Sequence, residues 1–151
     1  MSQNFAGSVE PVHPRTTAGQ HLSLLLGLVL LLLGIAGFAV SGFSDWTGGT
    51  QEQQVIGFSV NPASSAVHVV LGVLGVLART GARRARGYGV LLFVVLGALF
   101  AWGLASRGSG DTALNLAWPV TTLHGVLAVF ALVVVLVPVR AGRRESTAEL
   151  R

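Results

Sequence analysis

Residues 22–43 read LSLLLGLVLLLLGIAGFAVSGF, a run of 22 residues without one charged side chain. A helix that crosses roughly 30 Å of bilayer hydrocarbon needs about 20 consecutive, predominantly apolar residues. Three further uncharged stretches follow, at about 62–78, 88–106 and 118–139. The sequence therefore predicts an all-α fold, an integral membrane bundle of four transmembrane helices.

The composition supports the membrane class independently of these stretches. The chain has 151 residues, of which 52% are hydrophobic and 11% charged, and its mean hydropathy is +0.69. Soluble domains are usually about one-quarter charged, so this chain has too little polar surface to cover itself in water. It has no cysteine, which excludes disulfides, thiolate metal sites and thiol nucleophiles.

The arginines predict the orientation of the helices. All ten basic residues are arginine, and nine of them flank the same ends of the four stretches. These nine are Arg15, Arg79, Arg83, Arg84, Arg86, Arg140, Arg143, Arg144 and Arg151. The opposite loops carry only Arg107, together with Asp45, Glu52 and Asp111. Because cytoplasmic loops are enriched in Lys and Arg, we predict a multi-pass protein of the cytoplasmic membrane with both termini in the cytoplasm.

This topology divides the chain into three parts. Residues 1–21 form a predicted flexible cytoplasmic tail, residues 22–139 the transmembrane domain, and residues 140–151 a basic cytoplasmic tail. Trp46, Trp102 and Trp118 then all fall at the outer interface, where an indole buries its ring and keeps its N–H in water. The arginines account for the net charge of +4 without a nucleic-acid partner.

Two other interpretations concern the same segments. The first stretch could be a signal peptide cleaved after residue 41, but its apolar part exceeds the 7–15 residues of an ordinary h-region. Its removal would also leave an odd number of spans, which conflicts with the arginines. The basic loop after residue 78 either serves only as a topology determinant or also binds anionic lipid headgroups.

An internal repeat places one histidine in each of two apolar stretches. In NPASSAVHVVLGVLG (61–75) and WPVTTLHGVLAVFA (118–131), His68 and His124 share a pattern of start residues, hydroxyl, imidazole and small residues. The matched pairs are Asn61 with Asn115, Pro62 with Pro119, Ser65 with Thr121, Gly72 with Ala128, and Gly75 with Ala131. Positions −3, 0, +4 and +7 share one helix face. We therefore predict two parallel helical-hairpin repeats with the histidines at similar depth.

Small residues in the other two stretches predict where backbones approach closely. Gly27, Gly34 and Ser41 are spaced by seven in the first stretch, and Gly97, Ala101 and Ala105 by four in the third. Such lines mark helix contacts in membranes, within the chain or between copies of it.

Several roles are open for the histidine pair, because an ionisable group inside a membrane usually faces the bundle interior or a polar cavity. The pair could form a neutral polar core with other polar side chains, namely Asn61, Ser65, Asn115 and Thr121. It could line an outward-facing pocket for a small ligand or a proton, with the carboxylates of Asp45, Glu52 or Asp111 at its mouth. It could also ligate haem through both imidazoles.

Metal and enzyme chemistry find less support. A structural zinc site usually has four ligands, and the spans offer two, so we expect no metal. Ser65 and His68 share a helix face, but no buried acid orients the histidine as a hydrolytic triad requires. We expect no enzymatic activity.

The sequence also resembles a known family. GFSVNPASSAVHVVLGVLGVLA (57–78), the arginines with Gly87, Tyr88 and Gly89, and the later span with a mid-helix histidine are similar to small bacterial membrane proteins. This family is catalogued as domain of unknown function 4383 and is common in actinobacteria. The resemblance covers roughly residues 22–139 and implies a four-helix membrane protein with no established activity. Asn115 and Pro119 are separated, whereas Asn61 and Pro62 are adjacent, so the second copy departs from the motif.

The sequence thus predicts an accessory or structural membrane protein whose histidines organise the core. The alternatives are a small transporter or ligand-binding protein and, less favoured, a bis-histidine haem protein. The expected partners are the lipid bilayer and a second copy or another membrane protein.

Overall fold

The computed structural model describes residues 16–47, 53–107 and 113–138 and confirms a helical membrane bundle. The helices are α1 (Ala18–Ser41), α2 (Pro62–Ala78), α3 (Ala82–Ala105) and α4 (Trp118–Leu136), and the antiparallel strands are β1 (Gln54–Val55) and β2 (Phe58–Ser59). By length and apolar composition, α1, α3 and α4 are each able to cross a membrane. The remaining helix, α2, is apolar but shorter, with 17 residues.

Two helices begin earlier than predicted. Thr17 caps α1 through a capping box with Gln20, whose backbone N–H donates to Thr17 Oγ1 at 3.4 Å. Residues 18–21, predicted as part of the tail, therefore belong to α1. Similarly, α3 begins at Ala82 instead of Tyr88. Arginine is a good helix former, and the N-cap residue is Gly81, whose backbone is extended. Of the predicted tails, residues 1–15 and 140–151 lie outside the described residues, as does residue 139 at the end of the predicted fourth span.

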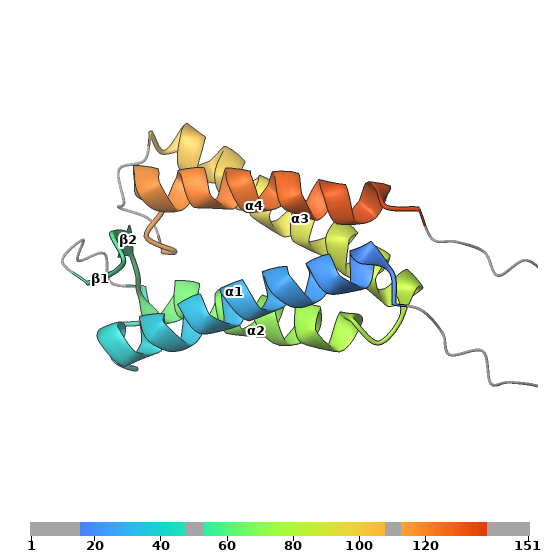
Figure 1. Cartoon of the computed structure of the whole chain (residues 1–151). Helices are drawn as coiled ribbons and strands as arrows, with labels where there is room; N and C mark the ends of the chain where they lie inside the picture. The colour runs from blue at the N-terminus through green and yellow to red at the C-terminus, as the bar shows by residue number, and fades with distance from the viewer. Residues whose placement is uncertain (1–15, 48–52, 108–112, 139–151) are drawn as a thin grey trace, which may run out of the picture.

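The four helices form two layers, each a helical hairpin (Figure 1). In the first hairpin α1 packs along α2, and in the second α3 packs along α4; contacts between the hairpins are far fewer. No Cα atom of α2 comes within 8 Å of a Cα atom of α4. Side chains must therefore fill the space between these two helices.

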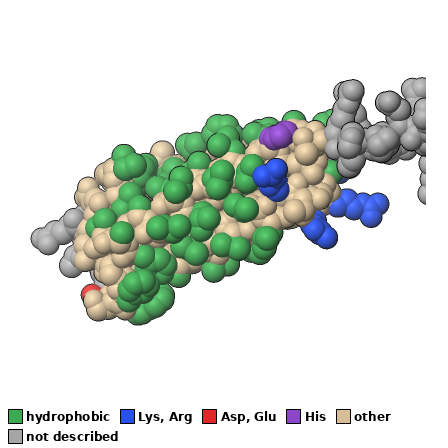
Figure 2. All heavy atoms as spheres, turned by 60° about the horizontal axis from the view of Figure 1, so that its bottom comes forward, with side chains coloured by type: hydrophobic (Ala, Val, Ile, Leu, Met, Phe, Trp, Pro, Cys, Tyr) green, Lys and Arg blue, Asp and Glu red, His purple; other side chains and the backbone are tan. Residues whose placement is uncertain are grey.

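The two ends of the bundle differ in character. The start of α1 and the end of α4 lie on the same side of the bundle as the α2–α3 turn (Figure 1), and the basic side chains gather there (Figure 2). We call this the arginine end, after Arg79, Arg83, Arg84 and Arg86. The described residues that follow α1 and α3 and precede α2 and α4, namely 42–47, 53–61, 106–107 and 113–117, form the opposite loop end, where Asp45 lies. Between the two ends, apolar side chains cover the surface; Leu32 and Leu136, for example, are 66% and 67% exposed.

Glycines bring the first hairpin into backbone contact. A Cβ atom on Gly34 of α1 would lie 2.7 Å from the backbone nitrogen of Val69 in α2, and one on Gly27 would lie 2.7 Å from that of Val76. Any larger residue would force the helices apart, as expected for small residues at membrane helix contacts.

The predicted line of small residues in the third stretch does not pack against a neighbouring helix. Gly97 has no atom within 4 Å of the position its Cβ would take, and Ala101 and Ala105 are exposed. The face of α3 that packs on α4 carries Gly89 and Gly103 instead, where a Cβ would meet Val134 and Thr121. Spacing alone did not indicate which of two glycine lines on one helix is buried.

Candidate functional site

The imidazoles of His68 and His124 meet in the bundle core. Their Nε2 atoms are 3.4 Å apart, and the ring centroids lie 5.6 Å apart with the planes tilted by 44°. Both side chains are buried, with 7% and 1% of their surface exposed. A neutral imidazole carries one N–H donor and one acceptor nitrogen, so one ring donates to the other.

The helix starts set the depth of this pair. Asn61 caps α2, with Pro62 in the first turn, and α4 begins at Trp118, with Pro119 in its first turn. Proline suits this position, since no helical hydrogen bond is lost there. Each histidine lies six residues after its helix's first residue, about 9 Å along the axis at 1.5 Å per residue. Both helices start at the loop end, and the two rings therefore reach the same level.

The hydroxyl groups three residues before the histidines point elsewhere. Ser65 Oγ lies against Gly37 of α1, so closely that a Cβ there would overlap it. Thr121 Oγ1 lies against Gly103 of α3 in the same way, and it donates to the Leu116 carbonyl at 3.0 Å. Each hydroxyl therefore packs within its own hairpin, and the structure does not bring it to an imidazole. Gly37 and Gly103 were missed because no spacing rule links them to the histidines.

Asn61 joins the two hairpins at the loop end. Its Oδ1 accepts from the Ser64 backbone N–H at 2.8 Å, and its Nδ2 donates to the Ala113 carbonyl at 2.9 Å. Ala113 belongs to the segment that precedes α4. The N-cap residue of α2 is therefore hydrogen-bonded to the segment before the last helix of the other hairpin.

Asn115 occupies a different environment from Asn61. Its φ is +53°, the left-handed region that asparagine tolerates better than most residues, and its side chain is fully buried. Within the described residues, neither atom of its amide has a hydrogen-bond partner. Asn115 therefore precedes its helix as Asn61 does, but it does not cap that helix, since Ala117 is the N-cap of α4.

Three further buried polar atoms have no partner among the described residues: Ser65 Oγ and His124 Nδ1 in the loop-end half of the core, and the Tyr88 hydroxyl nearer the arginine end. An unpaired buried polar group costs about 1–3 kcal/mol, and buried water usually satisfies such groups. Ser65 Oγ, His124 Nδ1 and the Asn115 amide therefore give the loop-end half of the core a surplus of hydrogen-bonding groups.

The remaining candidate residues lie away from this cluster. His21 is exposed near the start of α1, where its Nε2 lies 2.9 Å from Thr16 Oγ1. Asp45 is exposed at the loop end, while His13, Glu52 and Asp111 lie outside the described residues. In the described ranges, no three His, Cys, Asp or Glu side chains gather as a metal site would require.

The fold and this core define a small, predominantly apolar helical membrane protein with a buried histidine pair. Over residues 20–137 the chain matches the model of the family described as domain of unknown function (DUF4383). The chain belongs to this family. No curated protein and no solved structure matches this chain.

Proposed function

We propose that this chain is a non-enzymatic, accessory or structural component of the cytoplasmic membrane, in which the His68–His124 contact joins two helical hairpins. The observation that carries this proposal is the 3.4 Å approach of the two Nε2 atoms between helices whose Cα atoms stay more than 8 Å apart. The imidazoles reach across a space that the helix backbones leave open.

The energetics of membrane interiors favour such a role. Hydrogen bonds between membrane helices contribute about 0.6 kcal/mol on average and up to about 1.7 kcal/mol. Loss of one histidine costs more, because the other imidazole stays buried and unpaired, at about 1–3 kcal/mol. The pair therefore favours one relative placement of the hairpins over others.

Four crossings with both termini in the cytoplasm agree with the ends of the bundle. The α2–α3 turn and the described ends of the chain share the arginine end (Figure 1), as the positive-inside rule requires for two hairpins. The length of α2, about 25 Å at 1.5 Å per residue, lies at the lower limit for a spanning helix.

The hairpins are proposed as two copies of one unit. Ser65 rests on Gly37 in the first hairpin, and Thr121 rests on Gly103 in the second. The histidines follow three residues later in both, and their contact then lies on the axis that relates the copies.

We propose that the pair works without haem or metal. Two axial imidazoles on one iron would place their nitrogens about 4 Å apart, twice a metal–imidazole bond of about 2 Å, with the porphyrin between the rings. The direct 3.4 Å contact favours a hydrogen-bonded pair instead.

A second candidate is a small outward-facing site for a polar ligand or a proton. The Asn115 amide, Ser65 Oγ and His124 Nδ1 support it, because none of them has a partner among the described residues and each offers a hydrogen bond to a bound ligand.

A double-mutant cycle tests the leading proposal. We expect His68→Leu and His124→Leu each to lower the free energy of unfolding in detergent by about 1–3 kcal/mol, since each leaves one imidazole unpaired. The double variant should lose less than the sum, because neither unpaired imidazole remains. His21→Leu, at the exposed histidine, is the matched control and should change little.

Strictly additive losses would contradict a direct contact. If both single variants keep the stability of the unaltered chain but lose thermal stabilisation by a small polar ligand, the second candidate replaces the first.

A further inference from the structure

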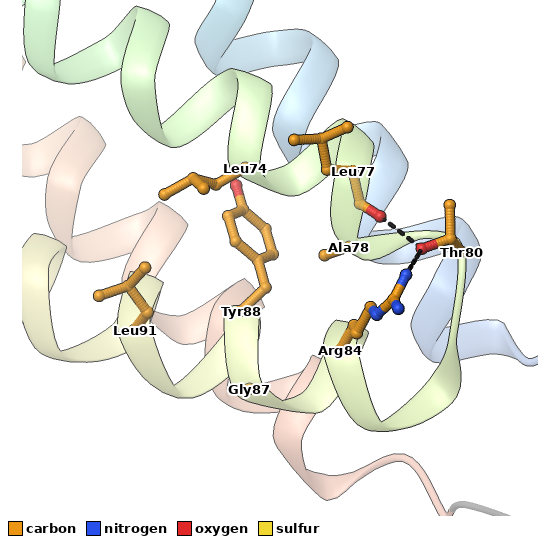
Figure 3. A pocket seen from close by; sticks show the side chains of 8 residues that line it. All are labelled: Leu74, Leu77, Ala78, Thr80, Arg84, Gly87, Tyr88 and Leu91. Atoms are coloured by element: carbon orange, nitrogen blue, oxygen red, sulfur yellow. Dashed lines mark hydrogen bonds between the residues drawn. The ribbon is translucent and has the colours of Figure 1, made fainter.

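A groove of about 550 Å³ lies between the end of α2 and the start of α3, at the arginine end (Figure 3). Its walls are apolar, formed largely by Leu74 and Leu77 of α2 and Leu91 of α3. These leucines are 40–59% exposed, so in a bilayer they would face lipid chains. The ring of Tyr88, only 4% exposed, fills the inner side of the groove.

One cation is fixed at the mouth of this groove. Arg84 Nη1 donates to Thr80 Oγ1 at 2.8 Å, and Thr80 Oγ1 donates to the Leu77 carbonyl at 2.8 Å (Figure 3). A guanidinium has five N–H donors in a planar fork, so most of them remain for another acceptor. Bidentate binding of phosphate is what this geometry favours.

The charge at this end is not balanced by acids within the described ranges. Asp45 is the one acidic residue in the described ranges, and it lies after α1, at the loop end. Arg84 also lies in the first turn of α3, whose N-cap, Gly81, offers no side-chain hydrogen bond. The N-terminus of a helix carries partial positive charge, which adds to that of the arginines.

The groove runs in the direction that a lipid would take. Arg84 and Leu91 are seven residues apart on α3, about 10 Å along the helix axis. A ligand with its phosphate on Arg84 would therefore extend along the helices, away from the charged end and toward the middle of the bundle. Phosphate at the membrane surface and hydrocarbon pointing inward is the arrangement of a phospholipid.

We propose that this groove binds one anionic phospholipid, with its phosphate on Arg84 and one acyl chain along Leu77, Leu74 and Leu91. The site requires only that the arginine end lie at a membrane surface, and it is independent of the histidine pair. It gives the basic α2–α3 turn a specific binding role beyond that of a topology determinant.

Thermal unfolding of the full chain in detergent, with added lipid, tests the site. Phosphatidylglycerol should stabilise the protein, and phosphatidylcholine with the same acyl chains should do so more weakly. Soluble glycerol 3-phosphate, which supplies the phosphate without the chain, should not stabilise it.

Matched variants separate a site from diffuse charge. We expect Arg84→Gln to weaken phosphatidylglycerol binding more than about tenfold, because it removes the charge-assisted hydrogen bonds to the phosphate as well as one surface charge. Arg83→Gln removes the same charge one residue away, outside the groove, and should weaken binding about fivefold at most. Leu91→Trp keeps all arginines and fills the groove, so it should also weaken binding.

Three results would overturn the proposal. These are equal losses in the Arg83 and Arg84 variants, equal stabilisation by the two lipids, and unchanged binding in Leu91→Trp. Each variant must melt like the unaltered chain without lipid, which the exposure of all three side chains favours.

Discussion

The close contact between α1 and α2 leads to a quantitative prediction for Gly34→Ala. The new Cβ would lie 2.7 Å from the Val69 backbone nitrogen and 2.8 Å from the Ser65 carbonyl oxygen, where ordinary Cβ contacts begin near 3.4 Å. The helices would have to separate by about 0.7 Å, the difference between 3.4 and 2.7 Å. A gap of that size forfeits a quarter to a half of the dispersion energy of each contact it opens.

The matched control is Gly97→Ala in α3, where nothing lies within 4 Å of the new Cβ. Both substitutions gain about 0.5–1 kcal/mol from the higher helix propensity of alanine, and that gain cancels in their comparison. Overpacking costs about 1–3 kcal/mol. We therefore expect Gly34→Ala to be less stable than Gly97→Ala by about 1–3 kcal/mol.

The assay is reversible unfolding in mixed micelles by titration with a denaturing detergent, followed by circular dichroism. Equal stabilities for the two variants would refute the glycine contact between α1 and α2. A loss in Gly97→Ala alone would show that the third stretch packs through the line Gly97, Ala101 and Ala105 after all.

Three further predictions concern the hairpins, the topology and the histidines. The double variant His68→Cys/His124→Cys has no other cysteine. Oxidation should not form a direct disulfide, because the Cα atoms are more than 8 Å apart and a disulfide needs less than about 7 Å. A bifunctional thiol reagent with a short spacer should link the two cysteines, and mass spectrometry distinguishes the products. Reporter fusions after Ser44 and Arg107 should be active in the periplasm, and those after Thr80 and Arg151 in the cytoplasm; the reverse pattern would overturn the orientation. Protein purified from haem-supplemented cells should show no Soret absorbance, and a Soret band lost in both His68→Leu and His124→Leu would establish the haem alternative.

Much of the fold follows from the sequence because membrane helices obey strong constraints. Uncharged length predicts the helices, and the proline at the start of α2 predicts that boundary correctly. The start of α3 was wrong by six residues because charge was taken as the end of helical structure, whereas Arg83, Arg84 and Arg86 extend the helix beyond its apolar part.

The candidate site was only partly predictable. The predicted repeat indicated that His68 and His124 lie at one depth, but side-chain partners depend on which helix lies beside which face. Ser65 and Thr121 contact glycines of their own hairpins, and Asn61 bonds a carbonyl 52 residues away. Contacts of this kind depend on tertiary arrangement, which periodicity along one helix does not contain.

The contact between the two imidazoles is the central claim, and solid-state NMR in lipid tests it most directly. With His13 and His21 replaced by glutamine and the remaining histidines labelled with ¹⁵N, only His68 and His124 give side-chain signals. A separation of 3.4 Å between the Nε2 atoms predicts a through-space ¹⁵N–¹⁵N correlation between the two rings. Two well-resolved histidines without that correlation would contradict the account.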